Sequence, residues 1–178
     1  RRSTSAPASV HSPEGRNPLV VASETGGMER EATVRVRTGG RLHFGFCNLS
    51  LAHERLYGGM GVALDAPRVE LVVEPDEGVH CEDPSVRPYV ARSVEMLDVP
   101  GARVSVSDSL PRHAGLGSGT QVALSALSGV ATAYGRAVRP REVAPDLGRG
   151  GRSGVGVATF EAGGFVLDAG HPTVRFTT

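Results

Sequence analysis

A glycine-rich segment over residues 111–121 has the residue types and spacing best suited to binding an anion. It follows Val104–Ser107, whose alternation is typical of a strand, and it precedes the apolar run Val122–Tyr134, which indicates a helix. Glycines let the backbone turn sharply and approach a ligand, and the free N–H groups at a helix start favour an anion there. The residues that we expect to contact a phosphate or another part of the substrate are Gly115, Gly117, Ser118, Gly119, Thr120 and Gln121.

The hydroxyl groups of this loop leave two interpretations open. Ser118 and Thr120 can cap the following helix, or they can supply an oxygen to a phosphate or a metal ion. The loop is not a Walker A motif, because no Lys precedes the Ser/Thr, and all 19 basic residues of the chain are Arg. The lack of Lys also excludes Schiff-base chemistry on a protein amine.

A second glycine-rich run, Gly148–Gly156, contains two arginines that suit an anion seat. Arg149 and Arg152 lie among five glycines, and a guanidinium group grips a phosphate or a carboxylate at two points. The alternative is a solvated surface turn. We favour anion binding by Arg149, with Ser153 as a further substrate contact, and we predict a catalytic role for Arg152.

The segment around residues 41–46 places polar and aromatic side chains on alternate faces of a predicted strand. If Phe44 and Phe46 point into the core, Arg41 and His43 share the opposite face. That face either lines a polar cleft or faces solvent. We predict that Arg41 binds substrate and that His43 takes part in catalysis.

Further along, Asp168 and His171 flank Gly170 after a predicted strand. A carboxylate and an imidazole at this place could meet a substrate or a metal, and we predict a catalytic role for Asp168. His113 lies within the first glycine-rich loop and can reach a ligand, although a lone His in a loop more often has no such role.

Hydrophobic periodicity predicts an α+β domain in which several early strands are followed by mixed helices and strands. The segments expected to form strands are 33–37, 42–47, 58–64, 68–74, 102–107, 155–160 and 164–168. The segments expected to form helices are 85–97, 122–134 and 139–143. Gly39-Gly40 and Asp65–Pro67 are expected to separate strands, and Gly135 to end the long helix.

Composition and charge exclude several classes of partner. Zero net charge, the absence of Trp and an aromatic content of 4% argue against nucleic acid. No apolar run reaches the ~18–20 residues of a membrane span, and no signal-peptide pattern is present. Cys47 and Cys81 form neither a metal-type pair nor a disulfide framework, so we expect reduced thiols in a cytoplasmic protein.

The 178 residues are enough for one domain with a hydrophobic core. Residues 1–30 are polar and lack periodicity, so we expect a disordered N-terminal extension, with Met28 near its end as a candidate start. Residues 31–178 are expected to form the folded domain. The sequence begins with Arg1 and ends in a strand-like segment, Val174–Phe176, which indicates a fragment.

Three motifs, taken in order, resemble those of the GHMP kinase superfamily, which includes galactokinase, homoserine kinase and mevalonate kinase. They are Gly40–Phe46, Gly115–Gln121 and Gly148–Val157, and Phe160–His171 extends the third. The chain is more similar to a branch that is not a kinase, the beta-ribofuranosylaminobenzene 5'-phosphate synthases. This resemblance covers about residues 32–178. It implies a GHMP-kinase-like N-terminal domain, with a mixed sheet and packed helices, that is truncated before the C-terminal domain.

The resemblance also implies a reaction and a cofactor. Such synthases condense 4-aminobenzoate with 5-phosphoribosyl 1-pyrophosphate, with release of carbon dioxide and pyrophosphate, in tetrahydromethanopterin biosynthesis. Ser118 resembles the superfamily Ser that contacts nucleotide-bound magnesium, so Mg²⁺ is the expected cofactor. Phosphoribosyl pyrophosphate and an aromatic acid are the expected small-molecule partners, and a homodimer is left open.

Gly156 is the main departure from the kinases, which carry Ser-Gly-x-Asp followed by Gly-Gly. Here Ser153-Gly154-Val155-Gly156 leads to Gly163-Gly164 at the same spacing. Glycine cannot orient or deprotonate a hydroxyl group, so the resemblance implies that the fold is kept while phosphoryl transfer is lost. Two alternatives stay open: an ATP-dependent small-molecule kinase that uses another base, and a non-enzymatic ligand-binding relative.

Overall fold

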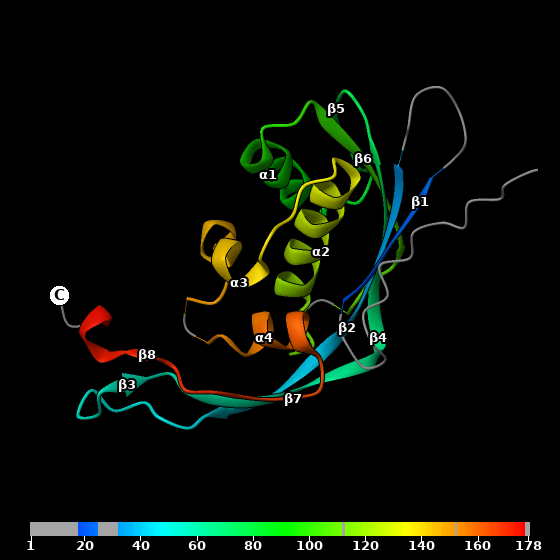
Figure 1. Cartoon of the computed structure of the whole chain (residues 1–178). Coiled ribbons are helices and arrows are strands. Elements are labelled where there is room, and N and C mark those ends of the chain that lie inside the picture. Colours follow the sequence, from blue (N-terminus) through cyan, green and yellow to red (C-terminus); the bar gives the residue numbers. More distant parts are fainter. Residues whose placement is uncertain (1–17, 25–31, 112, 152, 177–178) are drawn as a thin grey trace, which may run out of the picture.

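The computed structural model describes residues 18–24, 32–111, 113–151 and 153–176. In this part of the chain a curved six-stranded sheet carries its helices on one face (Figure 1). The strands of the sheet are β1 (Leu19–Glu24), β2 (Ala32–Phe46), β4 (Gly59–Pro75), β5 (Gly78–His80), β6 (Gly101–Asp108) and β7 (Phe165–Asp168). The helices are α1 (Arg87–Leu97), α2 (Ser118–Ala133), α3 (Pro140–Val143) and α4 (Val155–Ala162), with short 3₁₀ turns η1 (Ala144–Leu147) and η2 (Thr173–Phe176).

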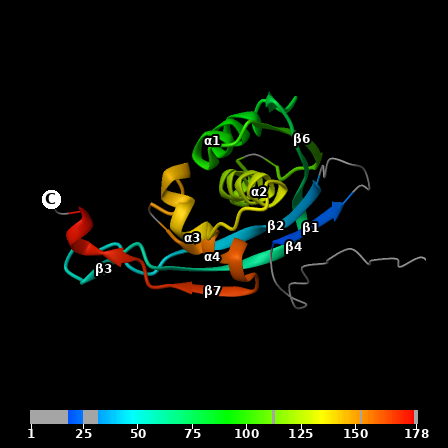
Figure 2. The ribbon, with the colours of Figure 1, turned by 45° about the horizontal axis from the view of Figure 1, so that its top comes forward.

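The strands of the sheet lie in the order β1-β2-β4-β6-β5, and β7 pairs with the first part of β4. The pairing of β5 with β6 is parallel and the other pairings are antiparallel. A separate pair, β3 (Arg55–Leu56) with β8 (His171–Pro172), extends from the body as an arm (Figure 2). This mixed sheet with packed helices confirms the predicted α+β class.

Strands β2 and β4 are each continuous where the sequence predicts a break. Gly39-Gly40 lies inside β2 and Asp65–Pro67 lies inside β4. The register of the two strands shifts between Gly39 and Arg41. A Cβ on Gly39 would lie 1.5 Å from the carbonyl oxygen of Leu64, so this irregularity requires a glycine. The predicted turns are wrong because glycine marks a bulge in a long strand as well as a turn.

Three further segments differ from expectation. Val155–Ala162 is helix α4 rather than a strand, because a short apolar run does not distinguish a buried helix from a buried strand. Leu19–Glu24 is strand β1, paired along the edge of β2, so the predicted disorder is wrong for these six residues. Val174–Phe176 belongs to the 3₁₀ turn η2. Residues 1–17 and 25–31, the latter including Met28, lie outside the described part of the chain.

The shift in register decides which side chains of β2 face the helices. Before it, Val34 and Val36 are fully buried. After it, the facing positions have the opposite parity, and Arg41 and His43 point toward the helix side, where they contact the segments that precede α2 and α4. Leu42, Phe44 and Phe46 are then exposed, Phe44 by 56%. The prediction that Phe44 and Phe46 point into the core is therefore wrong.

The predicted long helix is confirmed as α2, which is buried continuously from Gln121 to Ala131 and packs on β2 and β4. Gly135, with φ of +64°, follows its end. Among the described helices, none has both the length and the apolar character that crossing a membrane requires. Both cysteines are free, and burial raises the pKa of the Cys81 thiol.

We expect Gly129→Ala to lower the melting temperature. A Cβ on Gly129 would lie 2.7 Å from Val73 Cγ2 and 3.1 Å from Val36 Cγ2, so α2 would have to move away from the sheet. Overpacking of this kind costs about 1–3 kcal/mol, against a gain of about 1 kcal/mol in helix propensity. Thermal unfolding measures the difference. Gly151→Ala is the control, because its Cβ would meet nothing within 4 Å. A Gly129→Ala variant as stable as the parent would contradict the close contact.

Candidate functional site

The first glycine-rich loop leads directly into the first turn of α2. Gly117 occupies the N-cap position with φ of +71°, and its carbonyl oxygen accepts the N–H groups of Thr120 and Gln121 at 3.0 and 3.1 Å. Ser118 is therefore the first helical residue, and no side chain caps the helix. The capping interpretation of Ser118 is wrong, because the left-handed glycine makes the turn. First-turn N–H groups lack intrahelical partners and lie at the positive end of the dipole.

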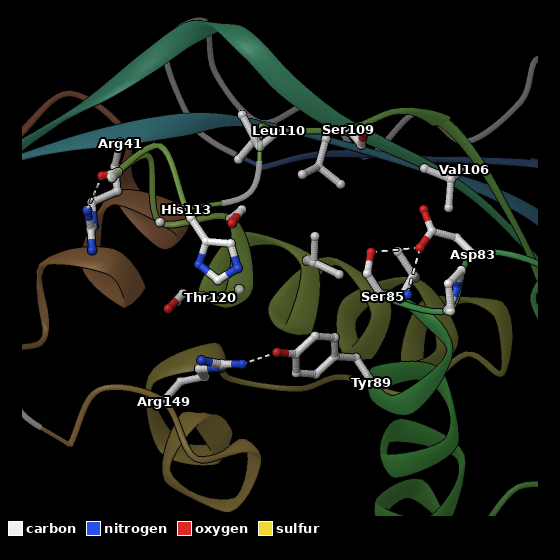
Figure 3. A pocket seen from close by; sticks show the side chains of 18 residues that line it. Arg41, Asp83, Ser85, Tyr89, Val106, Ser109, Leu110, His113, Thr120 and Arg149 are labelled. Carbon is white, nitrogen blue, oxygen red and sulfur yellow. Dashed lines mark hydrogen bonds between the residues drawn. The ribbon is translucent and has the colours of Figure 1, made fainter.

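A cavity of about 690 Å³ opens over this loop. Figure 3 shows Arg41, His113, Thr120 and Arg149 toward one end, and Asp83 and Ser85 toward the other. Of the predicted site residues, the cavity gathers Arg41, Gly115, Gly117, Ser118, Gly119, Thr120 and Arg149. Residues from two glycine-rich runs and from β2, far apart in the sequence, therefore line one cavity.

Two arginines lie directly against the glycines of the loop. A Cβ on Gly117 would lie 3.0 Å from Arg41 Cγ and 3.2 Å from Arg41 Cζ. A Cβ on Gly119 would lie 3.2 Å from both terminal nitrogens of Arg149. The Nε atoms of both arginines are buried and have no hydrogen-bond partner among the described residues. Because buried donors are normally paired, these two groups suit a ligand oxygen.

Protein contacts orient both guanidinium groups. Arg41 donates to the carbonyl oxygen of Gly115 at 3.1 Å. Arg149 donates to the hydroxyl of Tyr89, and its Cζ lies 5.1 Å from the centroid of the Tyr89 ring. Burial lowers the pKa of Arg41 from its ordinary value, yet an arginine stays charged over the physiological range. An anion in the cavity would thus meet two partly desolvated positive charges.

Tyr89 is a site residue that sequence reasoning missed. Its spacing with Val86, Val90 and Ser93 identified it only as part of the apolar face of a helix. The contact with Arg149 joins residues 60 positions apart, and nothing in the local pattern indicates it.

His43, Ser153 and Asp168 come together at the part of β2 that follows Arg41. Ser153 Oγ lies 3.3 Å from His43 Nε2. The carboxylate of Asp168 accepts the N–H groups of Gly154 and Gly170 at 2.6 and 3.0 Å. The pKa of His43 is lowered, first by burial and then by the charge of Arg41, and Asp168 opposes the shift. The imidazole is therefore neutral at neutral pH.

Two further candidates, Gln121 and His171, do not line the cavity. Gln121 is 1% exposed, and its amide accepts from Thr38 at 3.0 Å and donates to the carbonyl oxygen of Gly156 at 3.1 Å. It links β2 to α4 in the core and does not line the cavity, so the structure gives no support to its predicted substrate contact. His171 donates to the carbonyl oxygen of Gly150 at 3.0 Å. Arg152 lies outside the described residues.

Gly156 lies in the first turn of α4 and faces the start of α2. A Cβ there would lie 3.3 Å from Thr120 Cγ2 and 3.5 Å from Thr120 Oγ1. A carboxylate at position 156 would therefore be directed toward the glycine loop. With glycine in this place, the helix contributes no acid or base there.

Residues suited to a metal are few near the cavity. The described residues contain no group of three or more His, Cys, Asp or Glu side chains that could hold a metal ion. Ser118 contributes a hydroxyl to the cavity lining. Mg²⁺ commonly takes few protein ligands and completes its shell with phosphate oxygens and water, so one hydroxyl in the lining does not by itself define a metal site.

Comparison with known proteins agrees with this fold and loop. Residues 86–164 match the family GHMP kinases N terminal domain. The homoserine kinase of Cytophaga hutchinsonii has the same fold, with a TM-score of 0.54 and 19% identity, over 80% of this chain and 50% of that chain. The phosphomevalonate kinase of Streptococcus pneumoniae has a TM-score of 0.51 and 13% identity, over 73% of this chain and 47% of that chain. Residues 86–164 thus match the N-terminal domain of the GHMP kinases, and the described part of the chain has the fold of that domain.

Curated relatives of higher identity bear the name Beta-ribofuranosylphenol 5'-phosphate synthase. The protein of Archaeoglobus fulgidus is 34% identical over 144 residues, 79% of this chain and 46% of the relative. The protein of Methanothermobacter thermautotrophicus is 39% identical over 150 residues, which are 76% of this chain and 46% of the relative. This chain thus spans about half the length of these relatives. The resemblance to the synthase branch is confirmed, and the relatives are named for a phenol where the sequence led us to expect an aminobenzene.

Proposed function

We propose that the full-length protein is a synthase that joins a para-substituted benzoate to 5-phosphoribosyl 1-pyrophosphate. One observation carries the proposal: the glycine loop at the start of α2 is flanked by two arginines with buried, unpaired Nε donors. This arrangement suits a diphosphate group. The glycine at position 156 removes the carboxylate that a kinase of this superfamily would use, and the names of the relatives support a synthase.

The proposed reaction balances without a nucleophile from the protein. The ring carbon that bears the carboxylate attacks C1 of the ribose, and the C1–oxygen bond breaks with its electron pair leaving on pyrophosphate. The carbon–carboxylate bond then breaks, its electrons restore the aromatic ring, and carbon dioxide departs. An amino or hydroxyl group in the para position donates electron density to the attacking carbon. The acceptor is therefore 4-hydroxybenzoate, which agrees with the phenol in the relatives' name, or 4-aminobenzoate.

The residues of the cavity have separate roles in this proposal. Arg41 and Arg149 bind the diphosphate and stabilise the charge that grows on it as it leaves. The N–H groups of the first turn of α2 add to this stabilisation. Ser118 and the diphosphate oxygens would hold Mg²⁺, which when bound supplies further neutralisation of the leaving group. With no Lys in the chain, arginine is also the cation available to the benzoate carboxylate.

The test is an assay of the full-length protein with phosphoribosyl pyrophosphate and Mg²⁺. The acceptor is 4-hydroxybenzoate or, in a separate assay, 4-aminobenzoate, each labelled in its carboxyl group. Release of labelled carbon dioxide together with pyrophosphate is the expected result, and the ratio of kcat/KM values identifies the acceptor. Turnover of ATP with a small alcohol would instead favour the kinase alternative. Binding of phosphoribosyl pyrophosphate without turnover of any substrate would favour the non-enzymatic one.

We expect Ser118→Ala to weaken binding of phosphoribosyl pyrophosphate in the presence of Mg²⁺ by about tenfold, or ~1.4 kcal/mol. Stability should barely change, because Ser118 does not cap α2. Calorimetric titration and thermal unfolding measure the two effects. The control is Ser125→Ala on the same helix, which is fully buried and does not line the cavity. Equal affinity in both variants would remove Ser118 from the site.

A further inference from the structure

The contact between His43 and Gly45 determines where the His43 ring carries its proton. The backbone N–H of Gly45 donates to His43 Nδ1 at 3.3 Å, so Nδ1 is an acceptor without a proton. The ring is neutral at neutral pH, since burial and Arg41 lower its pKa. A neutral imidazole carries one proton. That proton must lie on Nε2, which faces Ser153 Oγ at 3.3 Å.

The hydroxyl of Ser153 consequently accepts two hydrogen bonds. One comes from His43 Nε2, and the other from the backbone N–H of Val155 at 3.3 Å. A serine hydroxyl has two acceptor lone pairs and one donor proton. With both lone pairs occupied, the O–H group can only donate to a third partner, and among the described residues none takes this proton.

We propose that Ser153 donates a hydrogen bond to an anionic oxygen of the bound substrate, and that His43 is a positioning residue that holds Ser153 in this donor state. The inference rests on the proposed function and revises the catalytic role predicted for His43. Because Nε2 is a donor, the ring cannot act as a general base toward Ser153, and Ser153 is not an activated nucleophile.

The charges around the pair favour an anion as the third partner. His43 and Ser153 are not among the residues that line the cavity, but Arg41, two residues before His43 on the same face of β2, is one of them; it is positively charged and has an unpaired Nε. Asp168, the nearby negative group, already accepts two backbone N–H groups. A carboxylate oxygen of the benzoate and a diphosphate oxygen offer the same chemistry to Ser153. The two substrates are distinguished by which affinity falls when the hydroxyl is removed.

Packing supplies a way to displace His43 from a distance. A Cβ on Gly59 of β4 would lie 2.9 Å from His43 Nε2 and 3.1 Å from the carbonyl oxygen of Gly45. Gly59→Ala would therefore push the ring away from Ser153 without changing His43 or Ser153. Gly129→Ala, whose Cβ would meet Val73 and Val36 instead, is the control for overpacking that does not reach His43.

Substitutions in the full-length protein test the proposal. Ser153→Ala is expected to lower kcat/KM by about 10–100-fold, as for loss of a hydrogen bond to a charged group. His43→Gln keeps an N–H donor and should retain most activity, whereas His43→Leu and Gly59→Ala should resemble Ser153→Ala. Thermal unfolding identifies any variant that fails to fold.

Two measurements, one of the pH dependence of activity and one of substrate binding, separate this role from a purely structural one. Protonation of His43 would put a proton on Nδ1 and expel the Gly45 N–H, so kcat/KM of the parent should fall on the acid side, below the ordinary His pKa. Arg41 opposes and Asp168 favours that protonation. The kcat/KM of His43→Gln should not show this fall at acid pH. Equilibrium titration of Ser153→Ala with 4-hydroxybenzoate and, separately, phosphoribosyl pyrophosphate shows which anionic oxygen is bound.

Long-range proton–nitrogen correlation spectra of the imidazole give a test that does not depend on turnover. The Nε2–H tautomer is expected at neutral pH, and the Nδ1–H tautomer would overturn the proposal. Unchanged affinity of Ser153→Ala for both substrates would overturn it as well. If no synthase activity exists, the proposed function fails, while the tautomer and the two titrations still decide the role of Ser153.

Discussion

The Gly156→Asp variant is expected to lose more than about 100-fold in kcat/KM for phosphoribosyl pyrophosphate. The new side chain would start 3.3 Å from Thr120 Cγ2 and carry its charge toward the start of α2. Two like charges ~4 Å apart at an effective dielectric constant of ~20 repel by about 4 kcal/mol. Gly156 is helical and its φ is not positive, so the backbone accommodates a side chain, but the position is buried and Thr120 must move slightly. Thermal unfolding therefore checks that the variant folds.

The same variant should gain no phosphorylation of small alcohols by ATP, because a carboxylate alone does not align a hydroxyl group with the transferred phosphoryl group. Gly156→Asn is the matched control, since it adds the same volume without the charge and should retain clearly more activity. The measurements are kcat/KM with phosphoribosyl pyrophosphate and an assay for ATP-dependent phosphorylation. Kinase activity in the variant with synthase activity intact would contradict our interpretation of position 156.

Arg41→Gln is expected to reduce kcat/KM by roughly 100-fold, mainly through weaker binding of the diphosphate. Arg41 lies against Gly117, and its Nε has no partner among the described residues. Hydrogen bonds to charged groups contribute about 1.5–3 kcal/mol each, and Gln can replace neither the charge nor the two-point geometry. The kcat/KM of Arg41→Lys should lie between the values of the parent and of Arg41→Gln, because Lys restores the charge without the planar guanidinium group.

The control for Arg41→Gln is Arg139→Gln, which removes an 81%-exposed arginine side chain from a surface pair with Glu142. Exposed pairs of this kind contribute about 0–1 kcal/mol, so its stability and activity should match the parent. Titration with phosphoribosyl pyrophosphate separates binding from turnover. If Arg41→Gln bound it like the parent, the arginines beside the loop would not form the diphosphate site.

The sequence alone was sufficient for the features that depend on local chemistry. The run from Gly115 to Thr120 has the glycine spacing and the following apolar helix of an anion-binding loop, and the structure places this loop on the cavity. The α+β class follows from hydrophobic periodicity, and helices α1 and α2 lie where that periodicity predicts them. Both kinds of inference need only neighbouring residues.

Tertiary structure decided the features that depend on contacts between distant segments. The register shift between Gly39 and Arg41 reverses the parity of β2, and so turns Arg41 and His43 toward the helices and exposes Phe44. Strand β1 owes its place to the edge of β2, and Tyr89 joins the site only through Arg149. The period of a strand identifies which residues share a face but not which face is covered, because that depends on packing between elements far apart in the chain.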